Sequence, residues 1–301
     1  MLHTIIMSLS ITTALTASSA LTDQPAQENG QQAPVINPAY AFMESLAEAD
    51  SNIDSMTSDI QYTIIQALES DLQRRIGTLY LNTDHDQDER AYAVRFNILE
   101  IDDRQEDIRE HYIFDGRWFV ERLPDEKQFN KRELVAADQR LDPMELMREA
   151  PFWVSLGQNT NRVFDSYRVQ LLDHKVGLAD NNDFPELKFL IETVVGAQQL
   201  LLTPKQGSGF EDDWDWVRIW FDSETKLPML YVKADFTGDL QIVQLLGVKT
   251  NTDLDPSLFD TTTPPPESGW NAQVTRWRGE AQAGPIDTAP IEDALYQEVT
   301  P

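Results

Sequence analysis

The sequence predicts an α+β protein, in which a strongly curved antiparallel sheet (an incomplete β-barrel) has helices covering its concave apolar face. Apolar and polar residues alternate with a period of two over much of 58–248, as they do in strands that bury one face. Short turn sequences between these segments favour antiparallel neighbours. Because one curved layer cannot fill its own concave side, helical segments at 38–54 and 143–156 are expected to cover it.

The first expected element is a helix. Pro38 suits its first turn, and Asn37 precedes it as the cap. The apolar residues that follow recur at helical spacing and therefore share one face. They are Phe42, Leu46, Ala49 and Ile53.

Strands follow this helix. The first is expected after Ser58 and contains Tyr62, Ile64 and Ile65. The others are expected at 74–82, at 91–99, in a hairpin over 111–121 that turns at Asp115-Gly116, and around 127–133. The alternation is clearest in 91–99, which predicts one apolar and one wetter face. The residues expected on the apolar face are Tyr92, Val94, Phe96 and Ile98.

A second helix interrupts the strands at mid-chain. Asp142 is its expected cap, Pro143 suits its first turn, and Glu145 completes a capping box. Pro151 ends or kinks it. The apolar residues around it are Met144, Met147, Phe152 and Trp153. Two interpretations remain open: they close the core, or they form a movable lid over the apolar face of the sheet, for which adaptable Met side chains are suited.

The second half of the chain again predicts strands. The expected segments are 167–172, 186–194, 198–203, 216–221, 229–234 and 240–248. Turns are expected at 222–226 and 235–239. So many consecutive strands predict one large curved sheet.

The composition excludes several classes of site. The 301 residues contain no Cys, which rules out disulfides, thiolate metal sites and a Cys nucleophile. The formal net charge of −27 predicts repulsion from nucleic acid and from acidic membrane surfaces. The charge is equally compatible with a simple role in solubility.

The two ends differ in composition from the middle. Residues 1–20 are typical of a signal peptide cleaved near Ala20, which predicts export, although a buried helix is the alternative. Residues 21–37 predict a flexible leader, 38–270 one domain, and 271–301 a disordered tail. No segment has the length of a membrane-spanning helix, so no stable membrane insertion is expected.

No motif predicts catalysis, a metal or a cofactor. The acidic run 84–89 begins like a calcium loop, but Glu89 stands where the loop needs Gly and Arg95 where it needs Glu. A solvated turn is the simpler interpretation. The His residues share neither a helix face nor a metal-ligand spacing, and no nucleophile elbow or phosphate loop is present.

Five pieces of the sequence resemble, in order, motifs of the periplasmic outer-membrane lipoprotein carriers, the LolA family with its LolA/LolB/RseB-type fold. They span much of 38–270. They are Gly77-Thr-Leu-Tyr-Leu, Tyr112-Ile-Phe-Asp-Gly-Arg-Trp-Phe-Val, Ala150-Pro-Phe, Leu201-Leu-Thr-Pro-Lys and the stretch 251–259 with the Pro run after it.

The resemblance implies an incomplete barrel closed by helices, with an apolar cavity for the acyl chains of lipoproteins or lipids. It implies a periplasmic carrier that acts as a monomer, with an inner-membrane exporter and an outer-membrane receptor as partners. A sensing or regulatory module of the same fold is the alternative. Thr83 stands where the family has its gating Arg, and 174–197 has the character of an insertion.

The residues expected to line the cavity combine both arguments. They come from the two helices and from the apolar faces of the strands. They are Phe42, Leu46, Leu79, Tyr92, Val94, Phe96, Ile98, Trp118, Met144, Met147, Phe152 and Trp153.

Overall fold

A computed structural model describes residues 37–68, 71–85, 89–101, 104–139, 141, 159–179 and 185–277. The chain divides into two compact units, 1–35 and 36–301, and all described residues belong to the second. The predicted signal peptide, nearly all of the predicted leader and the predicted helix at 143–156 lie outside the described residues.

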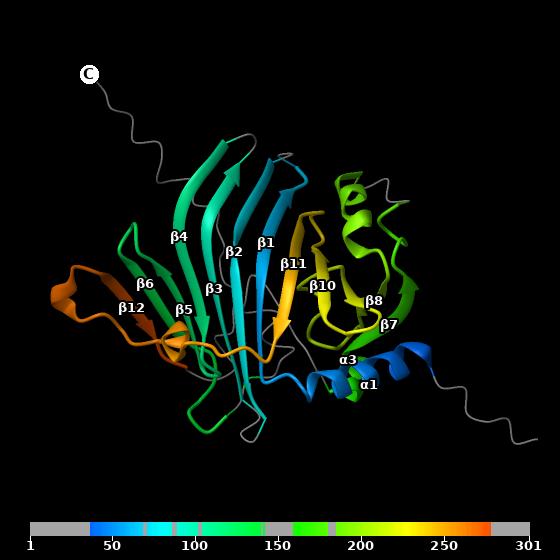
Figure 1. Ribbon diagram of the computed structural model, residues 1–301, viewed down its shortest axis with the longest axis horizontal. Helices are drawn as coiled ribbons and strands as arrows, with labels where there is room; N and C mark the ends of the chain where they lie inside the picture. The colour runs from blue at the N-terminus through cyan, green and yellow to red at the C-terminus, as the bar shows by residue number, and fades with distance from the viewer. Residues whose placement is uncertain are drawn as a thin grey trace, which may run out of the picture. The chain divides into compact units, whose positions relative to one another are not determined.

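The described strands form one twelve-stranded sheet (Figure 1). Its order is β12-β6-β5-β4-β3-β2-β1-β11-β10-β9-β8-β7. In the first half of the chain the strands are β1 (Ser55–Gln66), β2 (Asp71–Asp84), β3 (Glu89–Ile101), β4 (Arg104–Phe114), β5 (Trp118–Leu123) and β6 (Gln128–Glu133). The later strands are β7 (Tyr167–Asp173), β8 (Ala197–Pro204), β9 (Trp216–Asp222), β10 (Pro228–Ala234), β11 (Leu240–Thr250) and β12 (Asn271–Thr275).

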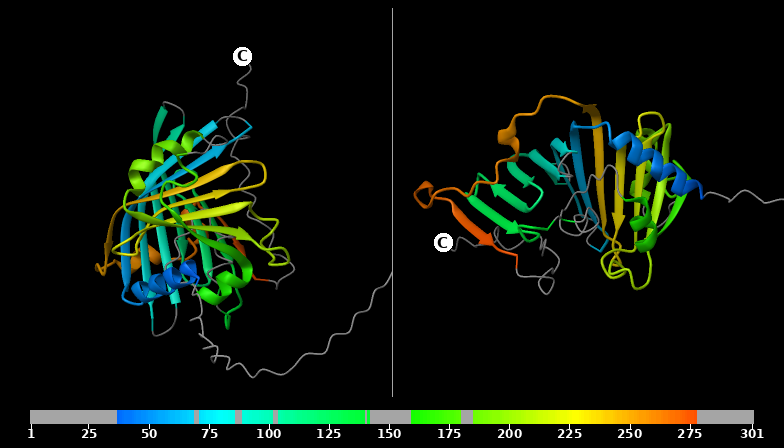
Figure 2. Two further views of the ribbon diagram at one scale, coloured as in Figure 1. Left: turned by 90° about the vertical axis from the view of Figure 1, so that its right-hand side faces the viewer. Right: turned by 90° about the horizontal axis from the view of Figure 1, so that it is seen from below.

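Pairing between β1 and β11 joins two meanders into this sheet. Strands β1 to β6 extend in one direction from the junction and β11 to β7 in the other, each antiparallel to its neighbour. Among the described strands, only β12 pairs in parallel, with β6. The views in Figure 2 show the curvature of the sheet. The predicted class, an unclosed and curved antiparallel sheet, is confirmed.

The described helices are few and short. They are α1 (Pro38–Asp50), α3 (Thr160–Ser166) and the 3-10 helices η1 (Pro185–Val194), η2 (Pro256–Phe259) and η3 (Pro266–Ser268). Helix α1 begins as the sequence predicts, because the Asn37 side chain accepts a 3.0 Å bond from the N–H of Ala39. Both α1 and α3 contact β7 and lie together beside that end of the sheet (Figure 1).

The two faces of the sheet bury different apolar clusters. The inner-face cluster includes Leu79, Val94 and Phe96, and it has members from every strand of β1–β5 and β7–β11 as well as from α1 and α3. On the outer face, one cluster packs under η1 and a second packs under residues 254–270. The chain from β11 to β12 therefore crosses the outer face, as Figure 2 shows.

Three elements differ from the sequence prediction. Residues 186–194, expected as a strand, belong to the 3-10 helix η1, whose Leu187, Leu190 and Val194 are fully buried on the outer face. Their spacing of three to four residues is helical rather than alternating. Strand β4 begins at Arg104, well before the expected 111. The sequence does not reveal this start, because residues 104–107 are all polar and show no alternation of apolar and polar side chains. Strand β12 forms within 271–301, the predicted tail.

Candidate functional site

The inner face of the sheet is the candidate site. Its cluster contains the predicted residues Phe42, Leu79, Tyr92, Val94 and Phe96, which are at most 7% exposed. Leu46 is half-buried and packs against the same cluster. The structure thus brings together predicted residues from one helix and two neighbouring strands.

The predicted residue Ile98 does not lie on the inner face. A β-bulge between Phe96 and Ile98 inserts one residue into β3, as the pairing with β2 shows, and the pairing with β4 is irregular at the same place. Ile98 therefore pairs with the outer-face residue Ile76, and Leu99 takes the inner-face position opposite Arg75. The alternation 92-94-96-98 ends at the bulge.

Trp118 also lies on the outer face. The next residue in β5, Phe119, belongs to the inner-face cluster, and Val120 belongs to an outer-face cluster. Because side chains alternate along a strand, Trp118 points to the same face as Val120. Three cations surround its ring, at 5.5 Å for Arg117, 4.5 Å for Lys131 and 4.7 Å for Arg276. Phe119, rather than Trp118, is the β5 aromatic residue of the inner face.

Four predicted residues, Met144, Met147, Phe152 and Trp153, lie outside the described residues. Their assignment to a lid or to the core stays a prediction. The described helix α3, which follows that segment, contributes Val163 to the inner-face cluster, and its Asn159 cap accepts a 3.2 Å bond from the N–H of Arg162. The sequence analysis did not predict α3, although Asn159 is a typical cap.

An ion pair lies on this apolar face and was missed by sequence reasoning. Arg75 on β2 donates from Nε to Glu110 Oε2 on β4 at 2.9 Å, and the two side chains are 16% and 15% exposed. The hydroxyl of Tyr112 donates to the same carboxylate oxygen at 3.3 Å. Tyr62 stands directly opposite Arg75 on β1. The sequence could have indicated this pair by position alone. Arg75 lies an even number of residues from Leu79 in β2, and Glu110 an even number from Phe114 in β4, so both point to the inner face.

The pKa values of these groups follow from burial and pairing. Burial disfavours the charged guanidinium, but Glu110, Tyr112 and Tyr62 offset this and raise the pKa of Arg75. Burial, with a further contribution from Glu110, raises the pKa of Tyr112 well above its ordinary value. Arg75 is therefore charged and the two phenols are neutral at neutral pH, and the hydrogen bonds to Glu110 place one satisfied polar group within an apolar surface.

Helix α1 is fixed at both of its ends. Near its start, the rings of Phe42 and Phe221 meet edge to face with centroids 6.1 Å apart. At its end, Asp50 pairs with the guanidinium of Arg90 on β3. Arg90 stands directly opposite Thr83, the position at which the resembling family carries its Arg. A neighbouring-strand arginine thus joins the helix to the sheet here.

The far end of the inner face is aromatic. Tyr167, Phe210 and Trp214 stack on one another with centroids 5.7 to 6.5 Å apart. The ammonium of Lys233 lies 5.6 Å from the Trp214 ring centroid. Burial lowers the pKa of Lys233 to about 8, although Asp213 and Asp235 oppose this shift. Among the described residues, no three His, Asp or Glu side chains gather as a metal site would require.

No family model and no curated protein matches the sequence. Among solved structures, the chain is similar to an uncharacterised conserved protein from Thermus thermophilus, with 12% identity, a TM-score of 0.40, and coverage of 79% of this chain and 98% of that one. It is also similar to a chain of the MucA/MucB complex of Pseudomonas aeruginosa, with 16% identity, a TM-score of 0.36, and coverage of 74% and 60%.

A third similar structure is a LolA superfamily protein from Nitrosomonas europaea, with 12% identity, a TM-score of 0.30, and coverage of 74% of this chain and 97% of that one. No helix in the described part of the chain is long and apolar enough to cross a membrane. The structure has the architecture that the resemblance of the sequence motifs implies, a curved and unclosed antiparallel sheet with helices against it.

Proposed function

We propose that this protein binds the acyl chains of lipoproteins or lipids against its inner face and carries them through the periplasm. One observation carries the proposal: the inner face is apolar across ten strands and two helices, from Phe119 on β5 to Val169 on β7. Each methylene group that moves from water onto such a surface gains about 0.8 kcal/mol. An acyl chain would therefore be shielded there.

The chemistry of the face favours binding over catalysis. Its polar pair, Arg75 and Glu110, is internally satisfied, and Tyr112 donates to the same carboxylate. Such a pair orients neighbouring side chains and fixes the strands, but it presents no free base or nucleophile to a ligand. The proposed activity is carriage, with no reaction.

The cellular setting belongs to the same proposal. The predicted signal peptide, cleaved near Ala20, would export the chain, and a carrier would then need an inner-membrane exporter as donor and an outer-membrane receptor as acceptor. The domain at 38–270 would be the lipid-binding unit. The segment with Met144, Met147, Phe152 and Trp153 would act as its lid.

A matched pair of variants tests where the acyl chain binds. Phe96 on the inner face and Phe129 on the outer face are both 1% exposed and both lie in the sheet. Phe96→Ala is expected to weaken binding of a fluorescent acylated peptide about tenfold, through lost ligand contact. Phe129→Ala should lose comparable stability, about 3 kcal/mol, and keep its affinity.

Folding is the control in this comparison. Each variant is measured by circular dichroism and urea unfolding before titration, and Phe96→Leu and Phe129→Leu replace any variant that does not fold. Equal loss of affinity in both positions would contradict binding at the inner face. A stoichiometric complex with a membrane-protein domain, formed without any acyl binding, would indicate the sensing module instead.

A further inference from the structure

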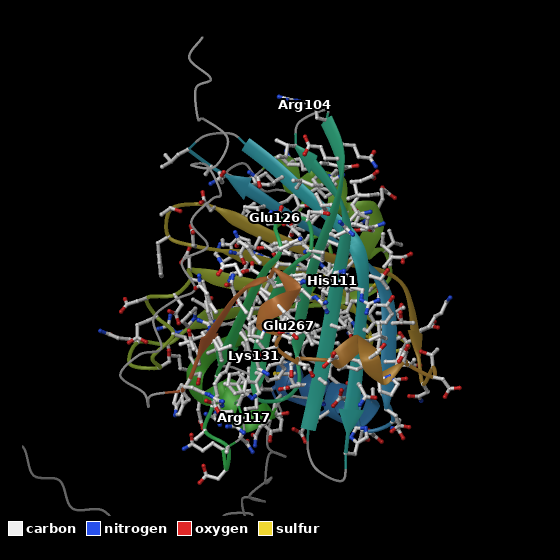
Figure 3. The ribbon with its side chains drawn as sticks, turned by 90° about the vertical axis from the view of Figure 1, so that its left-hand side faces the viewer. Arg104, His111, Arg117, Glu126, Lys131 and Glu267 are labelled. Atoms are coloured by element: carbon white, nitrogen blue, oxygen red, sulfur yellow. The ribbon has the colours of Figure 1, made fainter. Side chains whose placement is uncertain are left out.

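Three basic side chains stand in one row across the outer face. Arg95 on β3 is directly opposite His111 on β4, and His111 is directly opposite Arg122 on β5. All three are half-buried. Figure 3 shows His111 part-way along β4, with Arg104 at the far end of the same strand. Because like charges in such cross-strand pairs repel one another, the two arginines disfavour protonation of His111.

The two arginines of this row form no ion pair with any residue that the structure describes. The side chains of Arg95 and His111 form no hydrogen bond to a described residue either, and the buried Nε of Arg122 has no hydrogen-bond partner there. Several other arginines on or beside β2 to β5 do pair with carboxylates. Those pairs are Arg74 with Glu100, Arg75 with Glu110, Arg90 with Asp50, Arg109 with Asp125 and Arg117 with Glu133. Although the chain has 51 acidic residues, no carboxylate in the described part of the chain pairs with Arg95 or Arg122.

The segment after β11 forms one wall beside the row. Helix η2 contacts β3 and β4, and Arg122 lies over the Trp270 ring with its guanidinium carbon 5.0 Å from the centroid. Arg95 interacts electrostatically with Asp255, and Arg122 with Asp260. One oxygen of each carboxylate accepts a 2.9 Å hydrogen bond from the backbone N–H two residues later. These carboxylates offset the row from a distance without pairing with it.

We propose that Arg95, His111 and Arg122 form a binding site on the outer face for a phosphate-type oxyanion, bordered by η2 and Trp270. Two guanidinium groups on either side of an imidazole supply the planar donors that suit phosphate oxygens. The site is separate from the inner face, because these three residues lie on the opposite side of the sheet. It stands or falls independently of acyl binding.

The surroundings of His111 support this site. Burial first, and then Arg95, Arg122 and Arg109, lower the pKa of His111 to about 4. The charged groups around it are these three arginines on the strands, with Asp255 and Asp260 on the crossing segment. An oxyanion in the row would screen the guanidinium charges and favour imidazolium, so its binding should raise the pKa of His111.

The test uses the full-length protein and inorganic phosphate, with sodium chloride at equal ionic strength as the blank. Calorimetry measures affinity, and the His111 imidazole is titrated by NMR. Phosphate is expected to raise the pKa of His111 by roughly one unit. Arg122→Gln should weaken phosphate binding about tenfold. Asp255→Asn keeps the cap oxygen of η2 and should tighten binding about threefold.

Arg104→Gln is the matched control. It removes one positive charge from the exposed start of β4, so phosphate affinity should stay within about twofold. Equal affinities of Arg122→Gln and Arg104→Gln, or a His111 pKa that phosphate leaves unchanged, would overturn the site. The same variants, tested on phosphatidylglycerol–phosphatidylcholine vesicles against phosphatidylcholine alone, identify the source. Arg122-dependent binding of vesicles indicates a lipid headgroup, and binding of phosphate alone indicates a free phosphate or a monoester.

Discussion

At the scale of single residues, two buried cations on the inner face are accommodated in different ways. Arg75 and Glu110 pair at 2.9 Å and Tyr112 shares the same oxygen, so burial leaves neither charge uncompensated. Lys233 contacts an aromatic ring instead of a carboxylate. Its ammonium faces the Trp214 ring at 5.6 Å, and burial lowers its pKa to about 8.

Lys233 should therefore cost stability at neutral pH. Its folded pKa of about 8 lies below the ordinary value of 10.5, so the unfolded chain binds more protons between these values and stability rises with pH across that window. Lys233→Met is expected to raise the free energy of unfolding by about 1 kcal/mol at pH 7. The gain should shrink as the pH approaches 10.

Urea unfolding at several pH values checks this expectation. Lys249→Met, an exposed position on β11, serves as the control and should change little. A Lys233→Met variant that is less stable than the parent at pH 7 would show that the contact with Trp214 outweighs the cost of burial.

At the scale of elements, the bulge in β3 decides which side chains meet. It shifts Ile98 to the outer face and brings the backbone of β3 onto Gly77 of β2. A Cβ atom at Gly77 would lie 2.0 Å from the carbonyl oxygen of Arg95. Glycine is required here by close approach of the backbone.

Gly77→Ala is consequently expected to destabilise the protein by about 3 kcal/mol, since backbone atoms rather than a flexible side chain must move. Thr78→Ala, at the next position of β2, should cost less than about 1 kcal/mol. Thermal and urea unfolding of the two variants compare them. Equal stabilities would mean that the bulge relaxes without cost.

The sequence alone predicts elements well where the alternation is regular and poorly where it is interrupted. Tyr92, Val94 and Phe96 share a face as predicted, but Asn97 carries no Gly or Pro signal for the bulge that follows Phe96. The prediction of a strand at 186–194 was wrong because a short apolar run fits a strand and a helical turn equally well. The Arg75–Glu110 pair depends on strands that meet only in the folded sheet.

At the scale of the whole described sheet, the two meanders meet at β1 and β11, and together they present one apolar inner face. The outer face is covered by η1 and by the segment that runs to β12. A face this wide gives the proposed carrier its capacity for long acyl chains, and the joining of distant segments explains why no single stretch of sequence reveals it.

Native mass spectrometry of the protein purified from its native cells, followed by lipid extraction, tests the central claim most directly. We expect a bound lipid or acylated peptide that the parent retains and that Phe96→Ala loses. Protein that carries no lipid, and that fails to bind an added lipidated peptide while remaining folded, would contradict acyl-chain carriage.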